Sequence, residues 1–201
     1  MISLFIFILT SLGCISSANL IKTHPTRIVD FVHEYLPTIN STYLSDILVL
    51  IQVLSAILVM NLNQLNEMFL LMSCVQFLRA ICLASTVLPP LRSYDEKYRM
   101  GGLNGSGTEY IFSGHASYSA LTAIYLYTTN TVSLPFLIAY NLCSQYTIIA
   151  TKNHYTIDVI LAWIIVPLLY GNRFLFDIIN WWNPRTRRIW DCEISRTWRF
   201  R

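Results

Sequence analysis

The sequence predicts an all-α protein, a six-helix transmembrane bundle, from three observations. Of the 201 residues, 54% are hydrophobic and 12% are charged, with a mean hydropathy of +0.48, which is more apolar than an ordinary soluble domain. The apolar residues form five or six segments, each near the ~20 residues with which a helix crosses a bilayer. Lys and Arg lie mostly outside these segments. We therefore expect one compact domain with a bilayer as its solvent.

Most of the expected spans are joined by short links, but two links are longer, at 19–45 and 89–111. The predicted ranges are 2–18, 46–62, 68–88, 112–130, 134–151 and 156–172. The fourth and fifth are rich in Thr, Tyr, Ser and Asn. This composition favours helices that face the interior of a bundle rather than lipid.

The first segment has two alternative interpretations. Residues 2–15 could form the core of a signal peptide, because Ser16, Ser17 and Ala18 offer small residues for cleavage. However, no basic residue precedes the apolar run, which favours a retained first helix. Both alternatives deliver the residues after Asn19 to the same side of the membrane.

The basic residues predict the orientation of the chain. Seven of the fourteen follow the last span: Arg173, Arg185, Arg187, Arg188, Arg196, Arg199 and Arg201. By the positive-inside rule this tail is cytoplasmic, and we interpret its charge as attraction to anionic lipid rather than nucleic-acid binding. Loops 19–45, 89–111 and 151–155 then share the lumenal or extracellular face. Two glycosylation sequons, at Asn40 and Asn104, fall on the same face.

Two short motifs stand at the mouths of two spans: Ser113-Gly114-His115, and His154 with Asp158 four residues later. Four residues make about one helical turn, so this imidazole and carboxylate would share a face. The carboxylate would fix the tautomer of His154 and raise its basicity, as a nucleophile or general base requires. His115, beside a small and flexible step, could protonate a leaving group. Ionisable residues among apolar spans are costly, so we assign them a functional role.

Three further residues are candidates for substrate binding. Arg79 lies near the middle of the third expected span, where a charge is costly. We predict that it faces a phosphate; the alternative is a structural partner for a buried carboxylate. Ser113 and Gly114 are expected to bring backbone N–H groups close to the phosphate oxygens.

The remaining cysteines and histidines show no motif. The five cysteines have no CxxC spacing, so we predict neither a disulfide framework nor a metal site. Four of them fall inside apolar spans, and we predict that these are small buried side chains. His24 and His33 have no motif around them and are expected at the surface.

The stretch 109–115, the run 154–159 and the upstream Arg79 together resemble the sphingomyelin synthase family, within the type 2 phosphatidic acid phosphatase superfamily. The resemblance runs from about Arg79 to Trp182, roughly half of the chain. It implies a six-helix membrane enzyme that moves a phosphate-linked head group between lipids. Under this resemblance the chain divides into a first helix and lumenal loop, a catalytic transmembrane core and a basic cytoplasmic tail, at 1–45, 46–182 and 183–201.

The resemblance also implies roles for individual residues. His115, His154 and Asp158 would form the catalytic triad: His154 attacks the phosphorus, Asp158 orients it, and His115 assists the departing alcohol. The implied donor is a glycerophospholipid such as phosphatidylcholine, and the implied acceptor is ceramide or diacylglycerol. No metal or other cofactor is implied, and the oligomeric state stays open, a homodimer included.

Some positions depart from the family. Glu109 and Ala116 stand where the family has Asp and Thr, which leaves head-group and acceptor specificity open. Phosphatases of the superfamily usually carry a Pro and an Arg where this chain has Phe112 and Ile148. This contrast favours the transferases. The alternatives are a lipid phosphate phosphatase that uses water as acceptor at the same residues, and a non-catalytic membrane scaffold.

Overall fold

A computed structural model describes residues 2–19, 28–41, 43–86, 88–89, 91 and 111–172. These residues form helices and no strands, which confirms the all-α prediction for this part of the chain. The elements are α1 (Ile2–Asn19), α2 (Phe31–Tyr35), α3 (Tyr43–Val59), α4 (Leu62–Ser85), α5 (Gly114–Thr128), α6 (Leu134–Ala150) and α7 (Thr156–Tyr170). The sequon at Asn104, Glu109 and the Arg-rich tail lie outside the described residues, whereas Asn40 is described and exposed.

Six long helices coincide with the six expected segments, but two local features differ. Helix α4 begins six residues before the expected 68, because Asn61 caps it: its side chain accepts hydrogen bonds from the amides of Asn63 and Gln64, each at 3.0 Å. Because this first turn is polar, the apolar segment in the sequence does not reveal where the helix begins. The short helix α2, which Asp30 caps, was also not predicted.

Helix length alone supports only part of the predicted membrane topology. Among the described residues, α4 is the helix whose length and composition suffice to cross a membrane. Ser3–Cys14, α3, α6 and α7 are apolar but shorter, with 10–17 residues each. A 17-residue helix is about 25 Å long, slightly less than a ~30 Å hydrocarbon core. Six crossings of a bilayer therefore remain a prediction.

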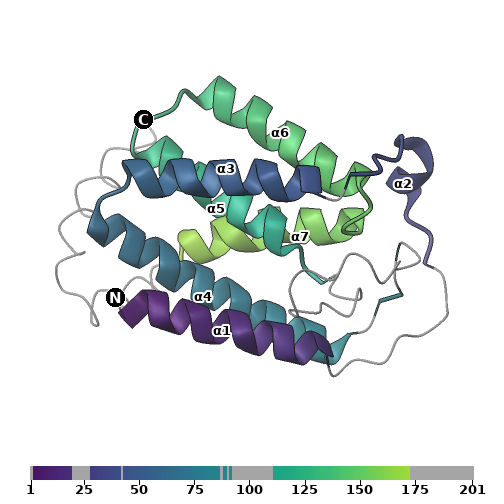
Figure 1. The fold of residues 1–201 in the computed structure, drawn as a ribbon, viewed down its shortest axis with the longest axis horizontal. Coiled ribbons are helices and arrows are strands. Elements are labelled where there is room, and N and C mark those ends of the chain that lie inside the picture. Colours follow the sequence, from purple (N-terminus) through teal and green to yellow (C-terminus); the bar gives the residue numbers. More distant parts are fainter. Residues whose placement is uncertain are drawn as a thin grey trace.

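Helix α5 is the centre of the bundle. It packs against α3, α4, α6 and α7, while α1 lies along α4 (Figure 1). Its buried face consists largely of small residues, which let neighbouring helices approach closely: Gly114, Ala116, Ser117, Ser119, Ala120 and Ala123. The largest fully buried side chains include Leu121 on α5 itself, and Phe112, Met68, Leu71 and Ile148 from outside this helix.

A polar network crosses the middle of the bundle. The hydroxyl oxygen of Ser119 on α5 lies 2.7 Å from Oδ1 of Asn141 on α6 and 2.9 Å from Oε1 of Gln52 on α3, and its single proton can be donated to either one. The amide of Gln145 donates to the Ser119 hydroxyl at 3.1 Å. Buried polar groups need such partners, so the network fixes how the three helices meet. The prediction that the fourth and fifth spans face the interior is correct for α5. For α6 it is correct on one face only, because Phe136 and other apolar side chains of this helix are exposed.

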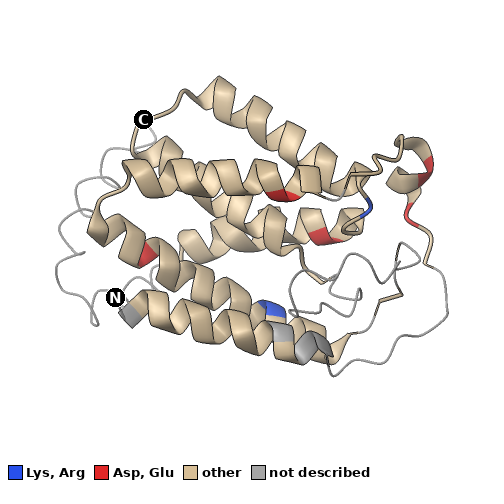
Figure 2. Cartoon of the chain, viewed as in Figure 1, with Lys and Arg blue, Asp and Glu red and all other residues tan. Residues whose placement is uncertain are grey.

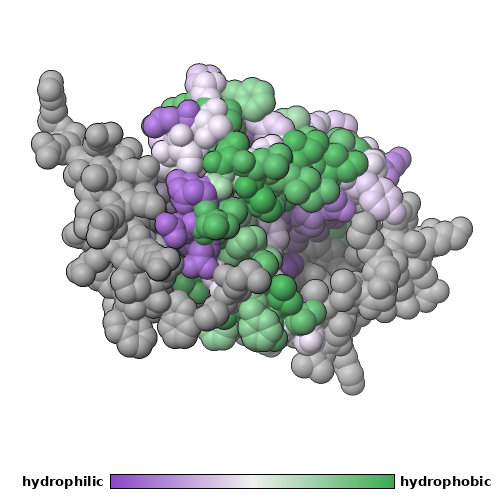
Figure 3. All heavy atoms as spheres, turned by 60° about the vertical axis from the view of Figure 1, so that its left-hand side comes forward, coloured by the Kyte–Doolittle hydropathy of each residue, from purple (hydrophilic) through white to green (hydrophobic). Residues whose placement is uncertain are grey.

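The outer surface is unusually apolar. Large hydrophobic side chains are exposed along α1, α3, α6 and α7, among them Phe5, Leu9, Leu50, Leu58, Leu142, Ile160 and Leu168. In Figure 3, apolar side chains cover much of the described surface and hydrophilic ones form smaller groups. Monomeric soluble proteins rarely expose so much contiguous apolar area. Most charged residues of the described helices lie toward the end of the bundle where α2 and the start of α7 are found (Figure 2).

Candidate active site

The two histidine motifs lie at the same end of the bundle. Ser113 is the N-cap of α5, where its Oγ accepts the amide of Ala116 at 3.1 Å. The amide of Ser113 donates to the carbonyl of Asp158 at 3.2 Å, which joins the start of α5 to the first turn of α7. As a result, the imidazoles of His115 and His154 lie close together, with ring centroids 5.9 Å apart and planes inclined by 59°.

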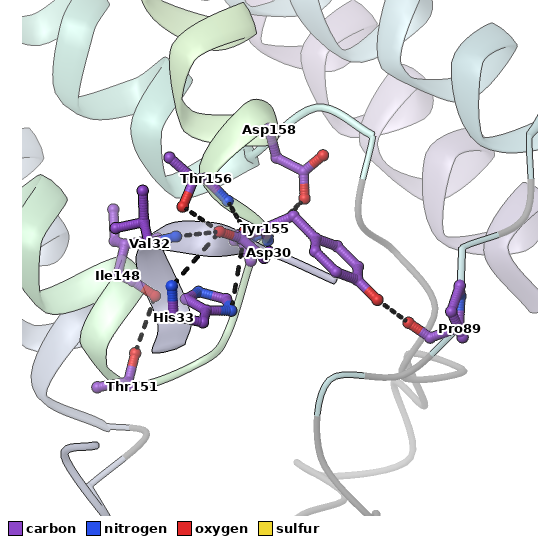
Figure 4. Close-up of polar contacts among 10 residues, drawn as sticks. Asp30, Val32, His33, Pro89, Ile148, Thr151, Tyr155, Thr156 and Asp158 are labelled. Atoms are coloured by element: carbon purple, nitrogen blue, oxygen red, sulfur yellow. Dashed lines mark hydrogen bonds and ion pairs between the residues drawn. The ribbon is translucent and has the colours of Figure 1, made fainter. Parts of the chain in front are cut away.

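His154 and Asp158 form the more buried half of the site. The distance from Nδ1 of His154 to Oδ2 of Asp158 is 3.7 Å, and their side chains are 7% and 0% exposed. This distance exceeds that of a hydrogen bond, although catalytic contacts often shorten only when substrate binds. His154 precedes α7, so the four-residue spacing acts across the start of a helix rather than along one. Oδ2 of Asp158 also accepts the amide of Tyr155 at 3.0 Å, as Figure 4 shows.

His115 has a carboxylate partner that the sequence analysis missed. Its Nε2 lies 2.8 Å from Oδ1 of Asp46, a residue in the first turn of α3. The two side chains are 37% and 41% exposed. Asp46 is an acidic residue at the start of the second expected span, which is the one sequence feature that could have drawn attention to it. No motif connects it with His115. The site therefore contains two His–Asp pairs that face each other.

Arg79 reaches the same end of the bundle from α4. Its Nε donates to the carbonyl of Phe112 at 2.9 Å, and its Nη1 lies 3.5 Å from Sγ of Cys14. A Cβ added to Gly114 would lie 3.4 Å from Nη1, so the guanidinium lies against this glycine. Arg79 is six residues before the end of α4, not near mid-span as expected. Its positive charge also acts on Asp158.

The backbone amides available at the N-terminus of α5 differ from those expected. The amide of Ser113 already donates to the Asp158 carbonyl, so in this arrangement it joins two helices and does not point to a phosphate. The first N–H groups of any helix lack an intrahelical acceptor. In α5 the first helical residues are Gly114 and His115. Their amides are therefore the better candidates for an anion.

Three segments that are distant in the sequence meet beside His154. The phenol of Tyr155 donates to the carbonyl of Pro89 at 2.9 Å. The amide of Ile39 donates to the carbonyl of Ala150 at 2.9 Å. The carboxylate of Asp30 accepts two hydrogen bonds from Thr156 (Figure 4). Parts of the three loops that were expected to share one face of the membrane are thus together at one end of the bundle.

The structure contradicts the prediction that His33 lies at the surface. The side chain of His33 is only 8% exposed. The ring stacks on that of Tyr155, with centroids 6.3 Å apart and an interplanar angle of 24°. A histidine outside any motif cannot be recognised as buried from the sequence. The contact between His33 and Tyr155 also depends on helix α2, which was not predicted.

The arrangement suits the displacement of a group at phosphorus. One buried imidazole with a carboxylate can act as a nucleophile, and the facing imidazole can exchange a proton with an alcohol oxygen. Arg79 has the positive charge, and the start of α5 has the N–H groups, that can stabilise phosphate oxygens. Among the described residues, no group of three or more His, Cys, Asp or Glu side chains is placed to hold a metal ion.

Comparison with known proteins agrees with this chemistry at a coarse level. Residues 107–174 match the family model described as PAP2 superfamily C-terminal, which covers about a third of the chain and includes His115, His154 and Asp158. No curated protein matches the chain. Members of the superfamily are typically phosphoesterases or phosphotransferases, so the match supports an enzyme that acts on phosphate groups. The match supports assignment of this chain to the type 2 phosphatidic acid phosphatase superfamily.

Proposed function

We propose that the protein is a membrane lipid phosphotransferase that resembles sphingomyelin synthases. It moves a phospho-head group, phosphocholine in the first instance, from a glycerophospholipid to ceramide or a similar lipid alcohol. The observation that carries the proposal is the pair of facing imidazoles, His115 and His154, each beside its own carboxylate. Phe112 and Ile148, which replace the usual Pro and Arg of the phosphatases, favour transfer over hydrolysis.

The first chemical step transfers the head group to the enzyme. Neutral His154 attacks the phosphorus, an N–P bond forms, and the P–O bond to diacylglycerol breaks. Protonated His115 gives its proton to the departing oxygen. Asp158 holds the His154 ring and balances the positive charge that develops on it, while Asp46 does the same for His115.

The second step transfers the head group to the acceptor. The lipid hydroxyl gives its proton to His115, its oxygen attacks the phosphorus, and the N–P bond to His154 breaks. The enzyme returns to its starting protonation state, so protons and bonds balance over the cycle. Because the transition state spreads charge over the phosphate oxygens, Arg79 and the amides of Gly114 and His115 lower its energy.

The surroundings of the site support a lipid as the second substrate. Asp158 and most of His154 are buried, and a site closed to water favours transfer over hydrolysis. The exposed apolar side chains of α1, α3, α6 and α7 suit contact with acyl chains. We further propose a multi-pass protein of the Golgi, another endomembrane or the plasma membrane, with the site on the lumenal or extracellular side and the C-terminus in the cytoplasm.

One observation keeps hydrolysis as a second candidate. His115 and Asp46 are more than a third exposed, so water can reach the imidazole that activates the acceptor. With water in place of the lipid hydroxyl, the same residues would release phosphate from a lipid such as phosphatidic acid.

The products of the reaction distinguish these functions. Membranes that contain the protein are incubated with phosphatidylcholine and fluorescent ceramide, and in parallel with phosphatidic acid. A new fluorescent phospholipid identifies a transferase, whereas released phosphate identifies a hydrolase. His154→Ala should abolish either product, and Leu58→Ala, at an 84% exposed position on α3, serves as the control. A His154→Ala protein with full turnover would refute the proposed site, and no product from any variant would favour a scaffold.

A further inference from the structure

The loop that carries His154 is held by a carboxylate from outside the site. Asp30, just before α2, accepts hydrogen bonds at Oδ1 from the amides of Val32 (3.1 Å) and His33 (3.4 Å). It also binds Thr156: Oδ2 accepts the amide at 2.7 Å and Oδ1 accepts the hydroxyl at 2.9 Å. Thr156 lies 126 residues further along the chain. One side chain, 8% exposed, thus caps α2 and α7 together (Figure 4).

Asp30 caps helix α7 from outside, because the N-cap residue of this helix makes no side-chain capping hydrogen bond. The first N–H groups of a helix have no acceptor within it, and Ser, Thr, Asp or Asn usually supplies one. Here the N-cap position is Tyr155, whose phenol donates to Pro89 instead. The Asp158 carboxylate is directed at the amide of Tyr155, which leaves the amide of Thr156 to Asp30.

His33 supports the same loop from the side. Its ring stacks on Tyr155 and its Nδ1 lies 3.8 Å from Oδ2 of Asp30. Burial lowers its pKa, and so does the nearby charge of Lys152, whereas Asp30 and the carbonyls of His154 and Ile149 raise it; the net shift is downward. A neutral aromatic ring therefore fills the space between α2 and the loop.

We propose that Asp30 and His33 form a clasp that positions His154 for attack on phosphorus, an inference that rests on the proposed function. Neither residue touches the reacting atoms, so both are positioning residues. The clasp fixes the start of α7 at Thr156, and His154 is two residues before it. A displacement of about 1 Å can slow a reaction about 100-fold, so loosening the clasp should lower kcat while leaving KM nearly unchanged.

The first experiment compares variants of the full chain in lipid nanodiscs. We expect Asp30→Ala to lower kcat about 10- to 100-fold with KM within about twofold. Asp30→Asn should recover part of the loss, because its carbonyl oxygen can still accept the amide of Thr156. Glu34→Ala removes an exposed carboxylate from the same short helix and should behave as wild type. Equal kcat values for Asp30→Ala and Glu34→Ala would overturn the proposal.

A second variant separates positioning from folding. Thr156→Val removes only the hydroxyl that donates to Asp30, and we expect it to lower kcat about threefold to tenfold in the wild-type background. In the Asp30→Ala background the same change should have no further effect, because the hydrogen bond is already absent. Effects that multiply fully in the double variant would overturn the coupling between the two residues.

Hydrogen exchange provides a readout that does not depend on activity. In Asp30→Ala, amides 154–158 should exchange faster, whereas those of α3 and α5 should keep their wild-type rates. Acceleration throughout the bundle would indicate general destabilisation and overturn a local clasp. If the wild-type protein neither transfers nor hydrolyses any lipid, the proposed function fails. The clasp is then judged by exchange alone: local acceleration supports it, and equal rates in Asp30→Ala and Glu34→Ala overturn it.

Discussion

His154 and His115 differ more in their surroundings than in their chemistry. His154 is almost buried and lies on a loop that is held by two hydrogen bonds, from the amide of Thr156 to Asp30 and from the phenol of Tyr155 to the carbonyl of Pro89. His115 is more than a third exposed and has a single short contact with Asp46. A nucleophile gains from a fixed direction and protection from water, whereas a proton carrier must meet two different alcohols in turn. The difference in exposure therefore supports the proposed roles, with His154 as the nucleophile and His115 as the proton carrier.

The strongest test of this comparison is the covalent intermediate. With a donor labelled in its phosphate, His154→Ala should form no phosphoenzyme, and turnover should fall by about 10⁴-fold or more. His115→Ala should still form the intermediate, slowly, because only the proton carrier is missing. Acid-labile, base-stable label on the protein is the measurement. Label in His154→Ala and none in His115→Ala would exchange the two roles.

We expect replacement of Asp158, the carboxylate beside His154, to lower kcat more than replacement of Asp46, the carboxylate beside His115. Asp158 is wholly buried beside the nucleophile, so we expect Asp158→Asn to lower kcat about 10³-fold, since the amide can hold the wrong tautomer of His154. Asp46 is accessible to water, which can replace part of its effect, so Asp46→Asn should cost about tenfold. Steady-state kinetics of both variants provide the measurement. A larger loss for Asp46→Asn would break the comparison.

Gly114→Ala examines the contact between Arg79 and the start of α5. The added methyl group would meet Nη1 of Arg79 at 3.4 Å, the edge of ordinary contact, so a small shift of the guanidinium can accommodate it. We expect KM for the donor to rise about threefold and kcat to stay close to wild type, because a shift well under 1 Å costs little. Gly13→Ala, where a Cβ would meet nothing within 4 Å, is the matched control.

The smallest expected effect is on stability as the pH falls. The pKa of His33 is lowered from its usual 6.5, mainly by burial, so the unfolded chain takes up a proton first and stability declines below about pH 6.5. Burial raises the pKa of Asp30, but hydrogen bonds from Thr156 and the charge of His33 bring it below 3.8. Its contribution is therefore kept above about pH 4 and lost at still lower pH.

Thermal unfolding of the wild type and of His33→Gln between pH 7.5 and 4.5 measures this effect. The melting temperature of the wild type should fall more steeply between pH 6.5 and 5 than that of the variant, which lacks the titrating ring. Parallel curves for the two proteins would mean that His33 does not remain neutral in the folded state.

The sequence predicted those features that depend on neighbouring residues. Apolar segments located the six long helices, and the spacing of His154 and Asp158 located a pair that does lie together. Burial of α5 followed from its small and polar residues. Such features arise from periodicity and composition, which a single chain displays directly.

Contacts between distant segments could not be read in the same way. Asp46 meets His115, and Asp30 meets Thr156, only after the helices have packed. Neither acid belongs to a motif. His33 lies on a helix of five residues, which is too short to appear as an apolar segment in the sequence. The early start of α4 was missed because a capping box is polar. Tertiary packing decided each of these positions.

The backbone hydrogen bond from Ser113 to Asp158 has a consequence for inhibition. Because this bond connects the N-cap of α5 to the first turn of α7, we expect it to help keep the two imidazoles at their observed separation. We expect a small molecule that inserts between the starts of α5 and α7 and breaks this hydrogen bond to move the two imidazoles apart. Such a molecule would inhibit the protein without occupying the binding site of either lipid. Such a compound would act irrespective of which head group or acceptor the protein prefers.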